Sequence, residues 1–368
     1  MSRLLIAFIS LVGAHFSPPA QTSPWKFATA GYKFEFPRDH ASHPDYKIEW
    51  WYYTGNVKAA DGRRFGYQVT FFRVGIDHTP TNPSKWAVRD LYMTHLAVSD
   101  ARGNRYRFAE KLSRGGPGLA GAETTRYYSW NDDWSAGLNE RGHHVLKAAS
   151  KQAAVDLVLD EGKPPAINGM NGISQKGAQP GNASHYYSLT RMPTRGTLMI
   201  DGERFDVQGE SWMDHEFGTS FLEPEQRGWD WLSIQLSDGR ELMLYQLRRA
   251  DGSRDPRSSG TAVDRSGRTT HLSNDQFTLT AGRARFKSKN GAVYPIEWTV
   301  TVPSQKLELR VTTPVNDQEL SLLPSTGIAY WEGMIDVNGT SNGNAVTGHG
   351  YLEMTGYHGS LGRVLSSR

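Results

Sequence analysis

Short alternating segments run through most of the chain and predict a fold built from strands. In them, apolar side chains occupy every second position, or β-branched and aromatic residues follow one another. Glycine, asparagine, aspartate or proline separates the segments, and the Asp-Gly pairs at 61–62, 201–202 and 238–239 are typical of tight hairpins. Helix signals are weak, so we expect an all-β protein, a sandwich or a barrel. The clearest segments are residues 63–74, 90–100, 153–160, 196–209, 229–252, 294–303, 306–313 and 327–339.

Two hairpins have the same order of features, which indicates an internal duplication. Residues 49–73 and 228–249 each run from a Trp-rich strand through Asp-Gly to Tyr-Gln and a closing Arg. A second pair shares the pattern G-x-x-[WY]-x-[DE] after two glycines six residues apart, at "GESWMD" and "GHGYLE". Repeated segments in the same register favour two copies of one structural unit.

The repeat divides the chain into two predicted β domains, residues 25–218 and 219–360, within the usual range of domain size. If each sheet closes into a barrel, its last strand can lie beside its first. The Trp-rich strand would then lie beside Asp214 in the first half, and Trp231 beside Glu353 in the second.

The first twenty residues predict a secretory signal peptide. Arg3 precedes an apolar run over residues 4–12, and cleavage is expected near residue 14 or 20. The alternative is a buried N-terminal strand. No other apolar run reaches the length of a membrane span. The 368-residue chain has no cysteine, so we expect no disulfide and no thiolate metal site, and export to a bacterial periplasm suits such a chain.

The charge pattern argues against a nucleic-acid partner. The chain has 41 Lys and Arg against 38 Asp and Glu, interspersed and without a basic block. Aromatic residues are plentiful, with 11 Trp, 16 Tyr and 14 Phe, so large rings must supply much of the buried surface.

The stretch "GESWMDHEFG" (209–218) ends a strand with an unusual density of charge. Strand alternation puts Met213 and His215 on one face, and on the other Glu210, Trp212, Asp214 and Glu216. One interpretation is simple exposure of the acids to solvent. The other places Asp214 or Glu210 beside aromatic walls, where burial would raise its pKa and let it act as a general acid.

Other polar residues allow both a functional and a structural interpretation. His95 has apolar neighbours on both faces of its strand, so it is either a hydrogen-bonded core histidine or a proton donor in a cavity. Trp231 either packs the barrel or forms a ligand wall. His143 and His144 are expected in a surface turn. No H-x-H or HExxH spacing exists, so we predict no metal site, although His95 and His215 are conceivable zinc ligands. Residues 162–188 are expected to form a long Gly/Asn/Pro loop, a lid or a disordered segment.

Several stretches resemble the AttH/CrtC-like family of two-domain lipocalin-like proteins. They are "HPDYKIEWWYYTGNV", "THLAVSD", "AINGMNGISQKG", "SHYYSLTRM", "GESWMDHEFG" and "GWDWLSIQLSDGRELMLYQLR". The family includes exported bacterial AttH-like proteins, which the stretches resemble closely, and more distantly carotenoid 1,2-hydratases. Some fungal hydratases and Diels–Alderases are distant relatives too. The resemblance implies two lipocalin-like (calycin) β-barrels in tandem, a cavity for a hydrophobic molecule, and a role in lipid or isoprenoid metabolism. The positions in these stretches that we carry over are Glu49, Trp50, Trp51, His95, Asn168, Asn171, Tyr186, Glu210, Trp212, Asp214, His215, Trp231 and Tyr245.

Three functions fit these features. The first is an enzyme without cofactor, a hydratase or isomerase, in which Asp214 or Glu210 protonates a C=C bond. The rings of Trp51, Trp212 and Trp231 would stabilise the cation, and His95 or Tyr245 would position water. The second is a periplasmic carrier that binds an apolar ligand and passes it to an ABC transport system. The third is a structural interaction module.

Overall fold

The protein is all-β, as the alternation predicted. The computed structural model describes residues 23–179, 181–219 and 222–361. Within these ranges the helical elements are two 3-10 turns, η1 (Arg38–His40) and η2 (Pro303–Gln305). None of the helices described there is long and apolar enough to cross a membrane. The predicted signal peptide lies outside the described residues.

The first sheet is antiparallel and forms a nearly closed barrel of eleven strands in the order β4-β3-β2-β1-β13-β12-β9-β8-β7-β6-β5, with β10 and β11 paired to β12. Near closure is visible at Asn131 of β6, whose amide donates to backbone oxygens of Tyr92 on β3 and Lys111 on β4. The strands are β1 (Ile48–Ala59), β2 (Arg64–Gly75), β3 (Asp90–Asp100), β4 (Arg105–Arg114), β5 (Ala120–Ala122), β6 (Tyr128–Asn131), β7 (Trp134–Leu138), β8 (His144–Ala149), β9 (Ala153–Leu159), β10 (Ala166–Ile167), β11 (Ile173–Gln175), β12 (Ala183–Ile200) and β13 (Glu203–Gly218).

The second half forms another antiparallel sheet, in the order β17-β16-β15-β14-β25-β24-β22-β21-β18, with β23 paired to β24. A short ribbon of β19 and β20 lies apart from this sheet. The strands are β14 (Gln226–Leu236), β15 (Glu241–Arg249), β16 (Ser259–Val263), β17 (Thr269–Leu272), β18 (Thr278–Ala281), β19 (Arg285–Lys287), β20 (Val293–Pro295), β21 (Glu297–Val302), β22 (Leu307–Thr312), β23 (Glu319–Leu322), β24 (Ile328–Ser341) and β25 (Asn344–Met354).

The first and last long strands of each half pair with each other, as the duplication led us to expect. In the first half β1 pairs antiparallel with β13, with Tyr52 opposite Asp214. In the second half β14 pairs with β25, with Trp231 opposite Glu353. The two hairpins that looked alike in sequence are β1–β2 and β14–β15, which open the two sheets.

Side chains fill the interior of each half. Alternate residues of β1 and β2, such as Trp51, Tyr53 and Phe71, point into the first barrel and join one large buried cluster. A separate cluster around Trp298 and Trp331 fills the second half. Rings therefore supply core volume in both, as the aromatic content suggested.

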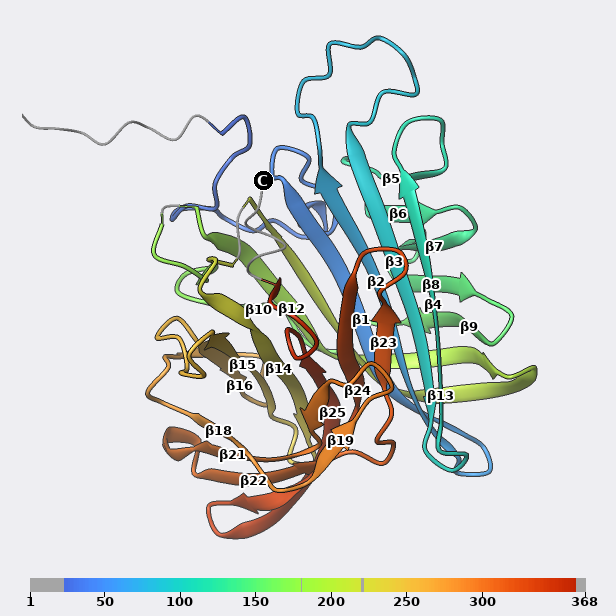
Figure 1. Cartoon of the computed structure of the whole chain (residues 1–368). Coiled ribbons are helices and arrows are strands. Elements are labelled where there is room, and N and C mark those ends of the chain that lie inside the picture. Colours follow the sequence, from blue (N-terminus) through green and yellow to red (C-terminus); the bar gives the residue numbers. More distant parts are fainter. Residues whose placement is uncertain (1–22, 180, 220–221, 362–368) are drawn as a thin grey trace, which may run out of the picture.

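A third buried cluster lies between the two halves. It joins Tyr52, Tyr186 and Trp212 of the first sheet to Trp231 and Tyr351 of the second. Figure 1 shows the first sheet (blue to green) and the second (yellow to red) side by side, with β1, β12 and β13 near β14, β24 and β25. The outer face of the first barrel is thus covered by the second half rather than by water.

The expectation of one long loop at residues 162–188 was wrong. This segment contains β10 and β11, and β12 begins within it at Ala183 and continues for 18 residues. The glycines and asparagines instead form the turn between β10 and β11, where Gly169, Asn171 and Gly172 have positive φ. The two short strands could not be predicted from their own composition, which is typical of a loop. They form because they pair with β12, which comes later in the chain.

Candidate active site at the domain junction

Asp214 lies between the two halves, neither in the barrel interior nor in solvent. The alternation predicted for β13 is correct, and Met213 and His215 face the barrel core. Trp212 and Asp214 share the opposite face, which the second half covers so completely that Asp214 is only 3% exposed. The second interpretation correctly predicted that Asp214 is buried beside aromatic rings, but it did not predict burial by another sheet, because one sheet viewed alone has only an inside and an outside.

Three donors from two strands hold the Asp214 carboxyl group. The Trp212 indole Nε1–H donates to Oδ1 at 2.6 Å, and the Ser188 hydroxyl donates to the same oxygen at 2.5 Å. The Tyr186 hydroxyl donates to Oδ2, and the Trp231 indole donates in turn to the Tyr186 oxygen at 3.2 Å. Predicted residues from three separate stretches therefore converge on one point: Tyr186, Trp212, Asp214 and Trp231.

Burial raises the pKa of Asp214 to about 7, although the hydrogen bonds from Ser188, Tyr186 and Trp212 oppose this. Two further acids lie close by on the second sheet. Burial also raises the pKa of Glu353 to about 7, helped by the charges of Asp214 and Glu216. Burial and the charge of Glu353 hold the pKa of Glu332 well above its usual range. The junction thus holds three acids that retain protons near neutral pH.

Glu332 and Glu353 also accept from aromatic side chains. The Tyr52 hydroxyl donates to Glu332 Oε1 at 2.6 Å, and the Trp229 indole donates to Glu353 Oε2 at 2.8 Å. Sequence reasoning missed Glu332 and did not place Glu353 at the site. The duplication was the available signal, since Trp212-x-Asp214 and Tyr351-x-Glu353 are equivalent copies that meet here.

His95 lies on another part of the same junction. Its Nδ1 is 2.7 Å from the Tyr330 hydroxyl of β24, and burial lowers its pKa to about 4, so the ring is neutral. Among the described residues its Nε2 has no hydrogen-bond partner, and the same holds for Gln68 Oε1, Tyr106 Oη and Glu332 Oε2. Buried polar atoms rarely remain unpaired, so this group can receive a water or a polar ligand atom.

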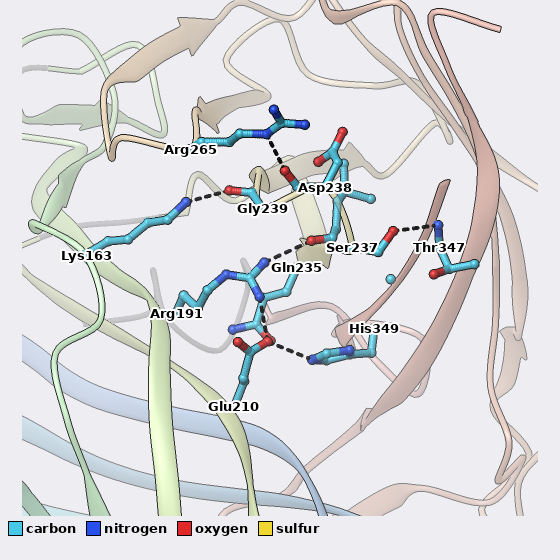
Figure 2. Close-up of a pocket in the computed structure, with 12 residues that line it drawn as sticks. Lys163, Arg191, Glu210, Gln235, Ser237, Asp238, Gly239, Arg265, Thr347 and His349 are labelled. Carbon is cyan, nitrogen blue, oxygen red and sulfur yellow. Dashed lines mark hydrogen bonds and ion pairs between the residues drawn. The ribbon is translucent and has the colours of Figure 1, made fainter. Parts of the chain in front are cut away.

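Glu210 lies at the outer edge of the junction. It forms an ion pair with Arg191 at 2.6 Å and lies 3.7 Å from His349. Figure 2 shows these groups in a pocket of about 480 Å³ between the halves, with Lys163 on the first-sheet side and Gln235 on the other. The Arg191 contact makes Glu210 a charged residue at the rim of the junction.

Tyr245 lies near Asp214 on the second sheet. Its hydroxyl is within hydrogen-bond distance of Ser174 and Ser259, at 3.0 and 2.9 Å. The buried Lys176 ammonium lies over its ring, 4.4 Å from the centroid, and pairs with Glu216 at 2.9 Å. Glu216, the third acid of the β13 face, is therefore paired with a lysine.

Glu49, Trp51 and His215 form a separate group inside the first barrel. The Trp51 ring stacks on His215 at 4.9 Å, and His215 Nε2 is 2.9 Å from Glu49 Oε1. Burial alone would raise the pKa of Glu49, but hydrogen bonds from His215 and His43 and the charge of Arg73 hold it well below its usual range. Trp51 is on the opposite face of the sheet from Asp214, so the two do not share one ligand site.

The remaining predicted positions are scattered. Asn168 is buried and donates to Ser188, which also contacts Asp214, at 2.8 Å. Asn171 is exposed in the β10–β11 turn. Trp50 packs against the junction cluster. Asn168 thus belongs to the surroundings of Asp214, whereas Asn171 lies in a turn.

Two groups inside the first barrel have the composition of a metal site. One is His43, Glu49 and His215, and the other is His40, His144 and Glu161. In the first, Arg73 pairs with the carboxylate, at 3.2 Å. His144 is buried in β8, so the expectation of a surface turn was wrong for it.

Comparison with known proteins decides the family. The family model described as AttH-like matches residues 27–357, nearly all of the described chain. The chain belongs to the AttH-like family. A protein of Nitrosomonas europaea assigned to AttH has the same fold, with a TM-score of 0.81 and 33% identity over 90% of this chain and 99% of that one.

Two further relatives of the AttH-like chain have names that state a reaction. Kievitone hydratase of Nectria haematococca shares the fold, with a TM-score of 0.69 and 15% identity over 90% of this chain and 96% of that one. Dehydratase asqC of Emericella nidulans is 20% identical over 73% of this chain and 77% of its own length. Both names describe the addition or removal of water.

The raised pKa of Asp214 predicts how the free energy of unfolding depends on pH. The folded-state pKa of about 7 lies above the ordinary value of 3.8, so the folded protein holds the proton more tightly than the unfolded chain. The stability that this proton provides is complete below about pH 4 and is lost as pH rises through about 7. At about 1.4 kcal/mol per pKa unit, we expect a loss of about 4 kcal/mol.

Urea unfolding of the wild type and Asp214→Asn from pH 4 to pH 8 measures this loss. The wild type should lose stability relative to the variant as pH rises, because the amide does not titrate. Asp206→Asn, an exposed residue on the same strand, should run parallel to the wild type. Parallel curves for wild type and Asp214→Asn would contradict a raised Asp214 pKa.

Proposed function

We propose that this protein is a hydratase or dehydratase that acts on a C=C bond of a hydrophobic small molecule at the domain junction. The observation that carries the proposal is the cluster of protonated acids, Asp214, Glu332 and Glu353, buried among aromatic rings between the sheets. Such acids are suited to give a proton at neutral pH, which solvated carboxyl groups cannot do.

The chemistry follows from the placement of the groups. In hydration, Asp214 transfers its proton to one alkene carbon, and water adds its oxygen to the other carbon. The added water then loses a proton to the Asp214 carboxylate that the first transfer leaves. Dehydration is the reverse. Positive charge on the substrate carbon would be stabilised by the nearby faces of Trp212 and Trp231.

The relatives support this class of reaction. The two with reaction names, a hydratase and a dehydratase, catalyse the two directions of one process. The unpartnered polar atoms of His95, Gln68, Tyr106 and Glu332 provide positions where a water or a substrate oxygen could bind. The substrate class proposed is a lipid or isoprenoid, by analogy with the family.

A second candidate is a carrier. The pocket at Glu210, Arg191 and Lys163 lies between the two halves, where a carrier could take up a ligand. In that case the protein would hold its ligand without chemistry and pass it to a partner such as an ABC transport system. For both candidate functions we propose that the two halves are lipocalin-like barrels. We also propose that the N-terminal signal peptide exports the protein to the periplasm.

Labelled water separates the two candidates. The full chain, purified from its host, is extracted with organic solvent and the ligand is identified by mass spectrometry. The protein is then incubated with that ligand in heavy-oxygen water. A hydratase should yield product that carries the label, or ligand that exchanges its hydroxyl oxygen. Boiled protein controls for exchange without catalysis, and ligand recovered unlabelled in the presence of active protein would support the carrier.

A further inference from the structure

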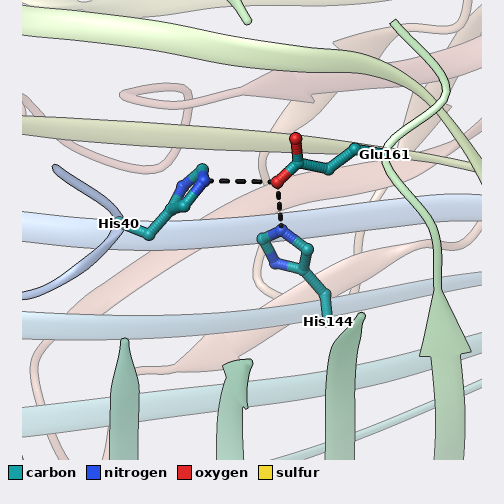
Figure 3. A group of neighbouring side chains, drawn as sticks. All are labelled: His40, His144 and Glu161. Atoms are coloured by element: carbon teal, nitrogen blue, oxygen red, sulfur yellow. Dashed lines mark hydrogen bonds and ion pairs between the residues drawn. The ribbon is translucent and has the colours of Figure 1, made fainter. Parts of the chain in front are cut away.

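We propose that His40, His144 and Glu161 form a binding site for a divalent transition-metal ion, best suited to Zn²⁺. The three residues come from η1, from the start of β8 and from the segment after β9, so no local motif joins them. Figure 3 shows both imidazole rings pointing at one carboxylate oxygen. The site is inside the first barrel and is independent of the proposed reaction at the domain junction.

The distances fit a tetrahedral zinc ion. His40 Nε2 and His144 Nε2 lie 3.2 and 3.3 Å from Glu161 Oε1, and the three atoms are within 4.8 Å of one another. Ligand atoms about 2.0 to 2.1 Å from a tetrahedral ion are about 3.3 Å apart. Two of the three distances between the ligand atoms, those from Glu161 Oε1 to the two histidine nitrogens, are therefore already right for zinc.

The hydrogen bond at His144 Nδ1 decides which nitrogen carries the proton, and it leaves the Nε2 lone pair directed at Glu161. The Tyr53 hydroxyl donates to Tyr127 at 2.9 Å, so its single proton is used. Tyr53 must then accept from His144 Nδ1, 2.9 Å away. The proton of neutral His144 is therefore on Nδ1, and Nε2 is a free acceptor.

The same argument applies to His40. The Tyr187 hydroxyl donates to the backbone oxygen of Asp39 at 3.2 Å, so its single proton is used. Tyr187 must then accept from His40 Nδ1, 2.7 Å away, so the neutral His40 ring carries its proton on Nδ1 and its Nε2 is an acceptor. Two imidazole lone pairs and a carboxylate oxygen thus point at one another without a proton between them. A bound cation would remove the repulsion among these three acceptor atoms.

The surroundings also favour a metal. Each histidine has its other nitrogen fixed by a tyrosine, the second layer of contacts that metal-binding histidines usually have. Across the described parts of the chain, Glu161 Oε1 lies near these two histidine nitrogens, at 3.2 and 3.3 Å, and no Lys or Arg is paired with it. The His43, Glu49 and His215 group differs, because Arg73 already neutralises its carboxylate.

Three protein ligands leave a tetrahedral ion one position for water or another ligand. The Glu161 side chain is 34% exposed, whereas the histidines are buried, so an ion can enter from the Glu161 side. The ion would tie η1 and the segment after β9 to β8.

Zinc titration of the full chain tests the proposal. Protein treated with a chelator is titrated with ZnCl₂ by calorimetry, and we expect one ion per chain and a higher Tm with zinc. Glu161→Gln keeps the shape of the side chain but removes its charge, and should weaken binding at least about tenfold. Asp160→Asn and His143→Ala are matched controls, because these neighbours pair with each other at 2.6 Å outside the site. Both should bind zinc like the wild type.

Cobalt substitution gives a readout that does not depend on a variant. A tetrahedral Co²⁺ site with nitrogen and oxygen ligands should give intense visible absorption, which excess Zn²⁺ abolishes. Absence of stoichiometric binding to the wild type would overturn the proposal. So would unchanged affinity of folded Glu161→Gln, which would place the ion elsewhere.

Discussion

Replacing Arg73 with methionine should destabilise the protein by about 3 to 5 kcal/mol, the usual cost of removing one partner from a buried ion pair. Arg73 is fully buried, and its guanidinium contacts Glu49 at 3.2 Å and Asp90 at 3.0 Å. It also donates to the backbone oxygens of His43 and Tyr46. Methionine fills a similar volume but leaves Glu49 charged, buried and without its cation.

Urea unfolding at neutral pH measures the loss. Arg126→Met is the matched control, since Arg126 pairs with Glu123 on the surface and is 66% exposed, so its removal should cost at most about 1 kcal/mol. The double variant Arg73→Met/Glu49→Gln should be more stable than Arg73→Met alone, because the second change removes the unpaired charge. Equal stability of Arg73→Met and Arg126→Met would show that the buried pair contributes nothing.

The sequence predicted the strands and their pairing because both depend on local pattern. Strand alternation assigned Trp212 and Asp214 to one face. The repeat divided the chain into two halves, and closure of each half into a barrel predicted that its last strand would lie beside its first, as β13 lies beside β1 and β25 beside β14. These inferences need only the period of a strand and the similarity of two segments.

The environment of each face could not be predicted in the same way. Whether the Asp214 face meets water, the barrel interior or another domain depends on how the two sheets pack, and strand alternation carries no information on this. Hence Tyr52 and Trp51, adjacent in sequence, contact Glu332 of the other half and His40 of the barrel interior, respectively. His40, His144 and Glu161 escaped notice because their separation in sequence matches no metal-binding motif.

Asp214→Asn should reduce turnover by about 100- to 10,000-fold if Asp214 is the general acid of the proposed reaction, the range that such proton transfers contribute. The amide oxygen can still accept from Trp212, and the amide nitrogen can donate to the Tyr186 oxygen, so the packing around residue 214 should be kept. Ligand retention, measured by native mass spectrometry, should therefore be unchanged. Loss of retention together with turnover would mean that Asp214 holds the ligand and need not react with it.

Two variants make the assignment specific. Glu353→Gln removes the second acid with a pKa of about 7, and should reduce turnover less than Asp214→Asn if Asp214 gives the proton. Asp206→Asn, exposed on the same strand, should leave turnover unchanged. A greater loss in Glu353→Gln than in Asp214→Asn would transfer the role of acid to the second sheet.

The pH profile supplies an independent argument. Hydration needs protonated Asp214, so kcat should fall as pH rises through about 7. Ser188 and Asp214 are in direct contact, and the Ser188 hydroxyl stabilises the charged carboxylate. Ser188→Ala should therefore raise the Asp214 pKa and move the decline in kcat to higher pH, while the fold is kept. If Asp214 had only a structural role, Ser188→Ala would change the amount of active protein but not the pH at which kcat declines. A shift of this decline to higher pH therefore identifies Asp214 as the acid that reacts.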